Sequence, residues 1–153
     1  GKSVKNPSNF LTRMGTPMSQ LIDAAGGLPE DTGKVIGGGP MMGKALVNTE
    51  VPICKGSSGV LIMNDKEAAR AEAQPCIRCA KCVSVCPMGL EPFLLATLSA
   101  QKDWERVEKE DVMSCIECGS CQFTCPSHRY LLDYIRLGKG TVGGIIRARN
   151  AKK

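Results

Sequence analysis

The sequence predicts an α+β protein in which a small module of strands and one helix is followed by a helical module. Short β-branched runs bounded by glycine and proline lie before about residue 63, whereas helix-favouring segments dominate after residue 75. With 153 residues the chain has room for one ordinary domain or two small ones. Because aromatic residues make up only 4% of it, a metal or another staple is expected to support its core.

Residues 1–63 are predicted to form the first module. A helix is expected to start with Pro17 as its first helical residue and Thr16 as its N-cap, and a glycine pair should end it. Residues 34–36 and 60–63 are short aliphatic runs typical of buried strands. Strands around one short helix indicate a small α+β module.

A glycine-rich stretch in this module approaches the phosphate-loop pattern without completing it. Ala45 stands where that pattern needs a hydroxyl for magnesium, and Pro40 removes one backbone N–H from the cradle. A tight structural turn is therefore predicted rather than a nucleotide site.

The second module is predicted to begin after a linker. Residues 64–74 are polar and alanine-rich and read as this linker, with a tendency to form helix. Two helical segments follow at 91–100 and 103–113, and Asp103 is expected to cap the second. These two segments lie between two cysteine-rich runs, which are described below. So long an insertion between the runs favours an all-helical domain over 75–138.

A final helix is predicted over residues 127–137. The glycines that follow, beginning with Gly138, are expected to loosen the chain. Residues 139–153 are therefore predicted to be a basic C-terminal tail.

Eight of the nine cysteines lie in two copies of the pattern C-x2-C-x2-C-x3-C-P, at 76–87 and 115–126. This is the bacterial-ferredoxin spacing for 4Fe-4S clusters, in which the fourth cysteine ligates the other cluster when two runs share a domain. Three cysteines spaced by two residues can turn their thiolates into one loop, while the fourth faces away from it. The pattern assigns one cluster to Cys76, Cys79, Cys82 and Cys125, and the other to Cys115, Cys118, Cys121 and Cys86.

Other uses of these cysteines explain the pattern less well. Zinc gives no reason for two identical four-cysteine runs that each end in proline. A disulfide framework suits neither nine cysteines nor neighbouring C-x2-C runs without a visible signal peptide. Purely structural clusters stay open as an alternative, because metal binding and folding are linked in small domains.

Charge and hydropathy exclude some function classes. The formal charge is +5, and two four-cysteinate clusters would lower it to roughly +1. No basic stripe is interleaved with aromatic residues, so nucleic-acid binding is not expected. The longest apolar stretches fall far short of the ~20 residues of a membrane-spanning helix, and thiolates kept for metal indicate a reducing, cytosolic compartment.

Side chains near the cysteines suggest how the clusters are tuned. Arg78 and Glu117 occupy equivalent positions of the two runs with opposite charge, which predicts a higher potential for the cluster on the Arg78 side. Cys54 is expected to be a small buried hydrophobe, and His128 a solvated residue. A dry apolar shell is expected from Ile77, Val83, Val85, Leu90, Ile116 and Phe123.

Several segments together resemble one family. The sequences VKNPSNF at 4–10, GGPMMG at 38–43, KGSSG at 55–59 and CPMGL at 86–90 are similar to the C subunit of the Rnf ion-translocating electron-transport complex. The resemblance implies a soluble-ligand-binding β-grasp module over 1–63, incomplete at its start, and a ferredoxin domain over 75–138. It also implies that NADH and FMN bind only on an upstream domain that this chain lacks, so that the chain is a C-terminal part.

The resemblance implies a peripheral subunit on the cytoplasmic side of the cell membrane. Such a subunit relays electrons between NAD(H) and ferredoxin within an oxidoreductase, while membrane partners couple the transfer to sodium or proton movement. Its expected partners are the other subunits of the complex, including a ferredoxin-like one. Two alternatives remain: a docking or structural module whose clusters are not a relay, and a subunit of a cobalamin-reducing flavoprotein built from the same two modules.

Overall fold

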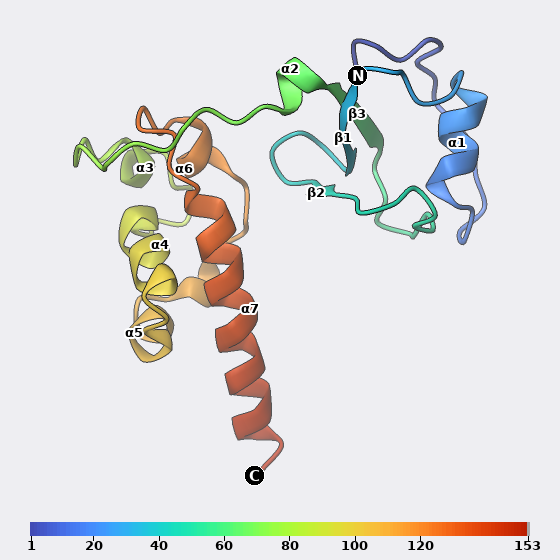
Figure 1. The fold of residues 1–153 in the computed structure, drawn as a ribbon. Helices are drawn as coiled ribbons and strands as arrows, with labels where there is room; N and C mark the ends of the chain where they lie inside the picture. The colour runs from blue at the N-terminus through green and yellow to red at the C-terminus, as the bar shows by residue number, and fades with distance from the viewer. Residues whose placement is uncertain (153) are drawn as a thin grey trace. The chain divides into compact units, whose positions relative to one another are not determined.

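The computed structural model describes residues 1–152 and divides the chain into two compact units (Figure 1). The first unit comprises residues 1–70, and the second begins at Ala71. Residues 64–70 of the expected linker thus belong to the first unit. No helix within residues 1–152 is both long and apolar enough to cross a membrane.

The first unit combines a small antiparallel sheet with two helices. The middle strand β1 pairs with β2 on one side and β3 on the other, with Ile36 of β1 opposite both Ala45 and Leu61. The strands predicted at 34–36 and 60–63 are confirmed, whereas β2 was not predicted. The elements in chain order are α1 (Met18–Ala24), β1 (Thr32–Gly37), β2 (Lys44–Ala45), β3 (Val60–Asn64) and α2 (Asp65–Ala68).

The buried apolar side chains of this unit come from both α1 and the sheet. Met18 and Ile22 of α1 are buried together with Ile36 of β1 and Ile62 of β3. The presence of both helices and a small sheet in the chain confirms the predicted mixed α and β composition.

Helix α1 begins one residue later than predicted. Pro17 is its N-cap, and the Thr16 hydroxyl donates to the Arg13 carbonyl at 2.8 Å instead of capping the helix. The first N–H groups of the helix, those of Met18 and Ser19, donate to backbone carbonyls of the 49–51 segment, so no side-chain cap is needed.

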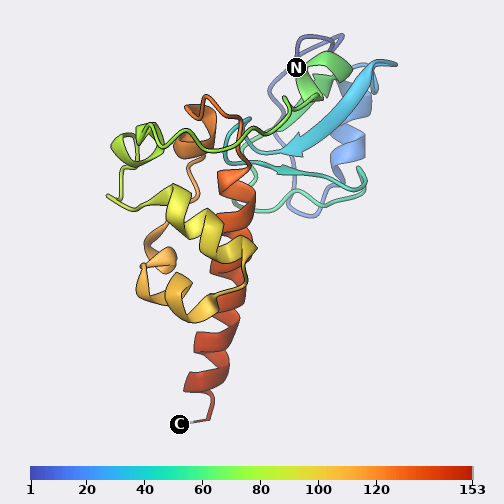
Figure 2. The same cartoon turned by 60° about the vertical axis from the view of Figure 1, so that its left-hand side comes forward.

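Helices α4 and α5 of the second unit lie along α7 in both views (Figures 1 and 2). Leu95 and Leu98 of α4, Val107 of α5, and Leu131 and Ile135 of α7 are all buried at 2% exposure or less. The elements are α3 (Lys81–Ser84), α4 (Pro92–Ala100), α5 (Trp104–Lys109), η1 (Val112–Ser114), α6 (Ser120–Phe123) and α7 (Leu131–Asn150).

Two predicted helices have close counterparts in this unit. The segment expected over 91–100 corresponds to α4, and the one expected over 103–113 is divided between α5 and η1. Asp103 caps α5 as predicted, since its carboxylate accepts from the Arg106 N–H at 3.3 Å.

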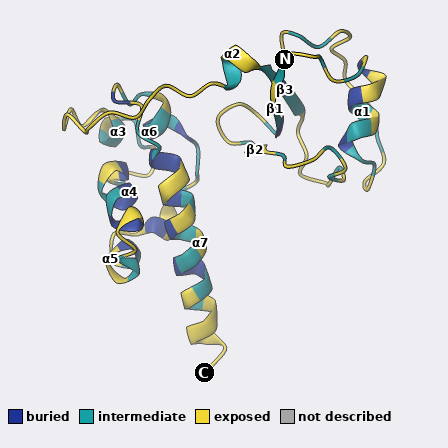
Figure 3. Cartoon of the chain, in the orientation of Figure 1, coloured by how far each residue is buried: buried dark blue, intermediate teal, exposed yellow. Residues whose placement is uncertain are grey.

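The prediction that the last helix ends at residue 137 is wrong. Helix α7 continues to Asn150 through the glycines, because tertiary contacts outweigh their low helix propensity. Gly138 and Gly143 are buried, and Gly138 lies against the fully buried Ser99 of α4. Residues 139–150 of the expected tail are therefore helical, while residue 153 lies outside the described residues. Figure 3 shows that burial on α7 is greatest in its first turns and gives way to exposure toward its end.

Candidate metal centres

The two cysteine runs repeat the same backbone conformation. Arg78 and Glu117 have φ angles of 55° and 56°, and Ala80 and Gly119 have φ angles of 56° and 84°. The short helices α3 and α6 start directly after Ala80 and Gly119. Left-handed backbone at three non-glycine residues is costly and is concentrated at functional sites in proteins. The repeated sequence is therefore also a repeated loop structure.

The left-handed turns direct backbone N–H groups toward sulfur. The Arg78 N–H donates to Cys76 Sγ at 3.4 Å, and the Glu117 N–H donates to Cys115 Sγ at 3.4 Å. Such N–H to sulfur bonds favour negative charge on the sulfur. These N–H groups are placed to stabilise thiolates once the cysteines lose their protons, although burial outweighs the Glu117 N–H bond and raises the pKa of the Cys115 thiol.

The first cavity contains cysteines of both runs. Its volume is about 600 Å³, and its lining includes Cys76, Cys79 and Cys82 of the first run with Cys125 of the second. Leu131, at the start of α7, also contributes. The first cavity thus collects the four cysteines that the spacing assigned to one cluster.

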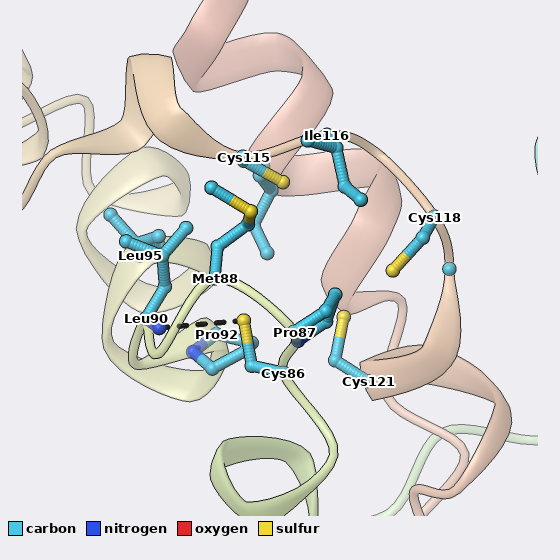
Figure 4. A pocket seen from close by; sticks show the side chains of 12 residues that line it. Cys86, Pro87, Met88, Leu90, Pro92, Leu95, Cys115, Ile116, Cys118 and Cys121 are labelled. Carbon is cyan, nitrogen blue, oxygen red and sulfur yellow. Dashed lines mark hydrogen bonds between the residues drawn. The ribbon is translucent and has the colours of Figure 1, made fainter.

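The second cavity has the reciprocal composition. It is lined by Cys115, Cys118 and Cys121 of the second run with Cys86 of the first, and its volume is about 20 Å³. Figure 4 shows the sulfurs of Cys86, Cys118 and Cys121 directed toward the space between them. Cys86 Sγ accepts from the Leu90 N–H at 3.4 Å, which is drawn as a dashed line.

The donor set of each cavity fits an iron–sulfur cluster. Each has four thiols, and neither lining includes histidine or a carboxylate, so the donors are the soft sulfur ligands that such clusters use. Within residues 1–152 no three metal-ligating side chains gather closely enough to hold a single ion. The first cavity is wider than the second.

Burial differs between the two sets of cysteines. Cys76 and Cys79 are exposed, whereas Cys121 is buried at 8% exposure. Burial raises the pKa of the Cys121 thiol to about 11. A hydrogen bond with the Ser120 hydroxyl instead lowers the pKa of Cys118. A thiol with a raised pKa is protonated at neutral pH, so binding of iron there releases a proton.

The expected apolar shell is only partly buried. Val83, Val85 and Leu90 are half-buried, but Ile77, Ile116 and Phe123 are 67%, 50% and 79% exposed. The prediction is wrong for the last three. Ile77 and Ile116 each line a cavity from a loop whose other side faces solvent, while Phe123 lines neither cavity.

The charges beside the two loops differ from the prediction. Glu117 Oε2 accepts from Arg136 Nε at 3.0 Å, and its Oε1 lies 3.6 Å from Lys139 Nζ. Arg78 has no ion pair within residues 1–152. Because two cations offset Glu117, the premise of opposite local charges is wrong, and with it the reason for a higher potential on the Arg78 side.

The sequence reasoning missed Arg136 and Lys139. They are three residues apart on α7 and reach the loop that carries Glu117. The sequence does show one carboxylate inside a cysteine run and a pair of cations in the helix that follows. Nothing in the sequence indicates that they meet, because only the fold brings them together.

Two further residues lie outside the cavities. Cys54 is exposed, so the prediction that it is buried is wrong. His128 is exposed, as expected, with φ 49° at the turn position that Gly89 occupies after the first run with φ 66°.

Two family models match different parts of the chain. The SLBB domain family matches residues 1–45, and the 4Fe-4S dicluster domain family matches residues 68–126.

Curated relatives match nearly the whole chain. The chain is 43% identical to the C subunit of the Na⁺-translocating ferredoxin:NAD⁺ oxidoreductase complex of Acetobacterium woodii, over 91% of its own length and 31% of the relative. It is 44% identical to the proton-translocating counterpart of Clostridium ljungdahlii over 89% of the chain and 30% of the relative. The C subunit of an ion-translocating oxidoreductase complex of Methanosarcina acetivorans is 39% identical over 90% and 31% of the two lengths.

The chain spans about a third of the length of these relatives. Their shared description is the one that the sequence motifs predicted. Over the part that it spans, the chain belongs to the family of C subunits of ion-translocating ferredoxin:NAD⁺ oxidoreductase complexes.

Proposed function

We propose that this chain is the electron-relay part of a C subunit in an ion-translocating ferredoxin:NAD⁺ oxidoreductase. The observation that carries the proposal is the composition of the two cavities, each lined by three cysteines of one run and the fourth of the other. The proposed ligands are Cys76, Cys79, Cys82 and Cys125 for one 4Fe-4S cluster, and Cys115, Cys118, Cys121 and Cys86 for the other.

The short helices give this chain the means to keep two clusters close together. Cys82 and Cys86 flank the end of α3 and belong to different sets, and Cys121 and Cys125 do the same at α6. Bound clusters supply reversible one-electron chemistry. The chain supplies thiolates, N–H groups aimed at sulfur, and two short connections between the sites. A relay needs this proximity, and a purely structural role does not.

The wider activity belongs to the complex. NADH and FMN are proposed to bind a part of the subunit outside this chain, so electrons would enter or leave the two clusters from there. We place the subunit at the cytoplasmic face of the membrane as a peripheral component, in contact with other subunits that include a ferredoxin-like one. The names of the relatives, which specify ferredoxin, NAD⁺ and ion translocation, support this proposal.

A docking role is the second candidate. Ile77, Ile116 and Phe123 expose apolar side chains on the cysteine loops and on α6. If these side chains form one contiguous apolar patch, a partner would bury it, since large contiguous patches mark contact surfaces. Docking and relay are compatible, and only reversible reduction separates a relay from clusters that merely shape the surface.

The test is anaerobic iron and sulfide analysis of the full chain, followed by a redox titration monitored by EPR. We expect about eight irons and two interacting one-electron signals at ferredoxin-like potentials. Zinc in place of iron, or clusters that cannot be reduced in that range, would remove the relay.

A further inference from the structure

The two cysteine loops share a backbone conformation but differ in how they are held. In the second loop, the Glu117 carboxylate is bound by Arg136 and Lys139 of α7. Lys139 Nζ also donates to the backbone carbonyl of Cys115, which is one of the proposed cluster ligands. The loop is therefore attached to α7 through both a side chain and its backbone.

These contacts are sheltered from water. The side chains of Glu117, Arg136 and Lys139 are 30%, 23% and 25% exposed. Charge-assisted hydrogen bonds in such surroundings are stronger than surface ion pairs, because water competes less for the charges. Helix α7 is a firm anchor, since Leu131 and Ile135 in its first turns are buried against the rest of the unit.

The first loop has no counterpart of this attachment. Arg78 stands at the position of Glu117 with the same left-handed φ, yet it forms no ion pair within the described residues. Residues 76–80 are all exposed, whereas Cys115, Glu117 and Cys118 are half-buried. The cavity beside the first loop is about 600 Å³, and the one beside the second is about 20 Å³.

We infer that Glu117 is a positioning residue that fastens the second cysteine loop to α7 through Arg136 and Lys139, so that the cluster of Cys86, Cys115, Cys118 and Cys121 outlasts the other. This inference rests on the proposed function, because it concerns retention of the proposed clusters. It assigns unequal durability to two sites whose sequence patterns are identical. The site on the first loop is the one that loses iron first.

The experiment challenges the iron-loaded full chain with an iron chelator under anaerobic conditions. Samples are quenched with a thiol-alkylating reagent, and mass spectrometry identifies which cysteines have become free. We expect Cys76, Cys79, Cys82 and Cys125 to be labelled before the other four.

The decisive comparison uses matched variants at equivalent positions. Glu117→Gln keeps the size and backbone of the residue but removes its charge, so labelling of the second set should become roughly 5- to 30-fold faster. Arg78→Gln makes the equivalent change in the first loop and should leave labelling of the second set unchanged. Arg136→Lys retains a cation and should lose less of the protection than Arg136→Gln.

Amide hydrogen exchange provides a readout other than iron. In the loaded chain, Glu117→Gln should raise exchange at residues 115–119 and not in the α4 core, which also shows that the variant is folded. The inference is overturned if Glu117→Gln and Arg78→Gln change the labelling of the second set equally, or if both sets are labelled together in the unchanged chain. Either result would leave the proposal of two bound clusters intact. If the chain takes up no iron, the proposed function fails and the inference fails with it.

Discussion

The contact between Gly138 and Ser99 sets how closely α7 and α4 can approach. A Cβ added at Gly138 would lie 2.2 Å from Ser99 Oγ and 3.2 Å from Val107 Cγ1. Gly138→Ala should therefore overpack the core and lower the free energy of unfolding by about 1–3 kcal/mol, as measured by chemical denaturation of the iron-loaded chain.

Gly140 is the matched control for this change. It lies two residues further along α7, is exposed, and has nothing within 4 Å of an added Cβ. Gly140→Ala should stabilise the chain by about 1 kcal/mol through helix propensity alone. Equal effects of the two alanines would show that the close helix approach has no energetic consequence.

The reciprocal cysteine arrangement makes a prediction for one residue. Cys125→Ser should reduce the bound iron from about eight to about four per chain, with the loss confined to the cluster of the first run although Cys125 lies in the second. Iron analysis combined with alkylation mapping measures both the amount and the location. Cys54→Ser, at an exposed cysteine outside both cavities, should retain all the iron. Loss of the Cys115 site in Cys125→Ser would contradict the exchange of fourth cysteines.

At the residue scale, local patterns were predictable and long-range pairings were not. The two sets of four cysteines could be assigned from their spacing, because the spacing repeats in the sequence itself. Asp103 could be predicted as a cap because its partner is only three residues away. The partners of Glu117 lie 19 residues or more along the chain, on a helix whose orientation depends on packing. No periodicity in the sequence encodes such a meeting.

At the scale of elements, helix α7 shows where propensity fails. Its glycines predicted an end near residue 137, yet Gly138 and Gly143 are both buried, and Gly138 lies where only a small residue allows the close approach to Ser99. Strand β2 was missed for the opposite reason. It has only two residues, both exposed, and therefore no apolar alternation.

The end of α7 is attached to α5 by a bidentate ion pair. Arg149 Nη1 and Nη2 donate to Glu108 Oε1 and Oε2, each at 3.0 Å. Arg149→Gln should speed amide exchange in the last turn of α7 with little change in global unfolding, because the pair is largely exposed. The same change at Arg147, which has no ion pair within residues 1–152, should leave that exchange as it is. An equal response to both changes would mean that the ion pair does not hold the helix end.

At the scale of the whole molecule, the two units have separate cores. The first is built on Met18, Ile22, Ile36 and Ile62, and the second on α4, α5 and α7. Only the second carries the cysteine cavities, so a ligand bound there stabilises that unit alone. Calorimetry should show two unfolding transitions, of which only one shifts to lower temperature when iron is removed. A single transition that moves as a whole would contradict independent units.

The position of Cys125 in the cavity of the first run also sets an order of events during synthesis. When the ribosome has released Cys76, Cys79 and Cys82, a cluster there would still lack its fourth thiolate, which follows only after α4, α5 and α6 have been made. Under the proposed ligation, the second site is complete only when Cys121 has been made and the first only when Cys125 has been made, so iron delivery to either follows synthesis of α4 and α5 but not of α7. A ribosome stalled between α5 and α6 would carry a nascent chain with four cysteines of the first run and no complete site.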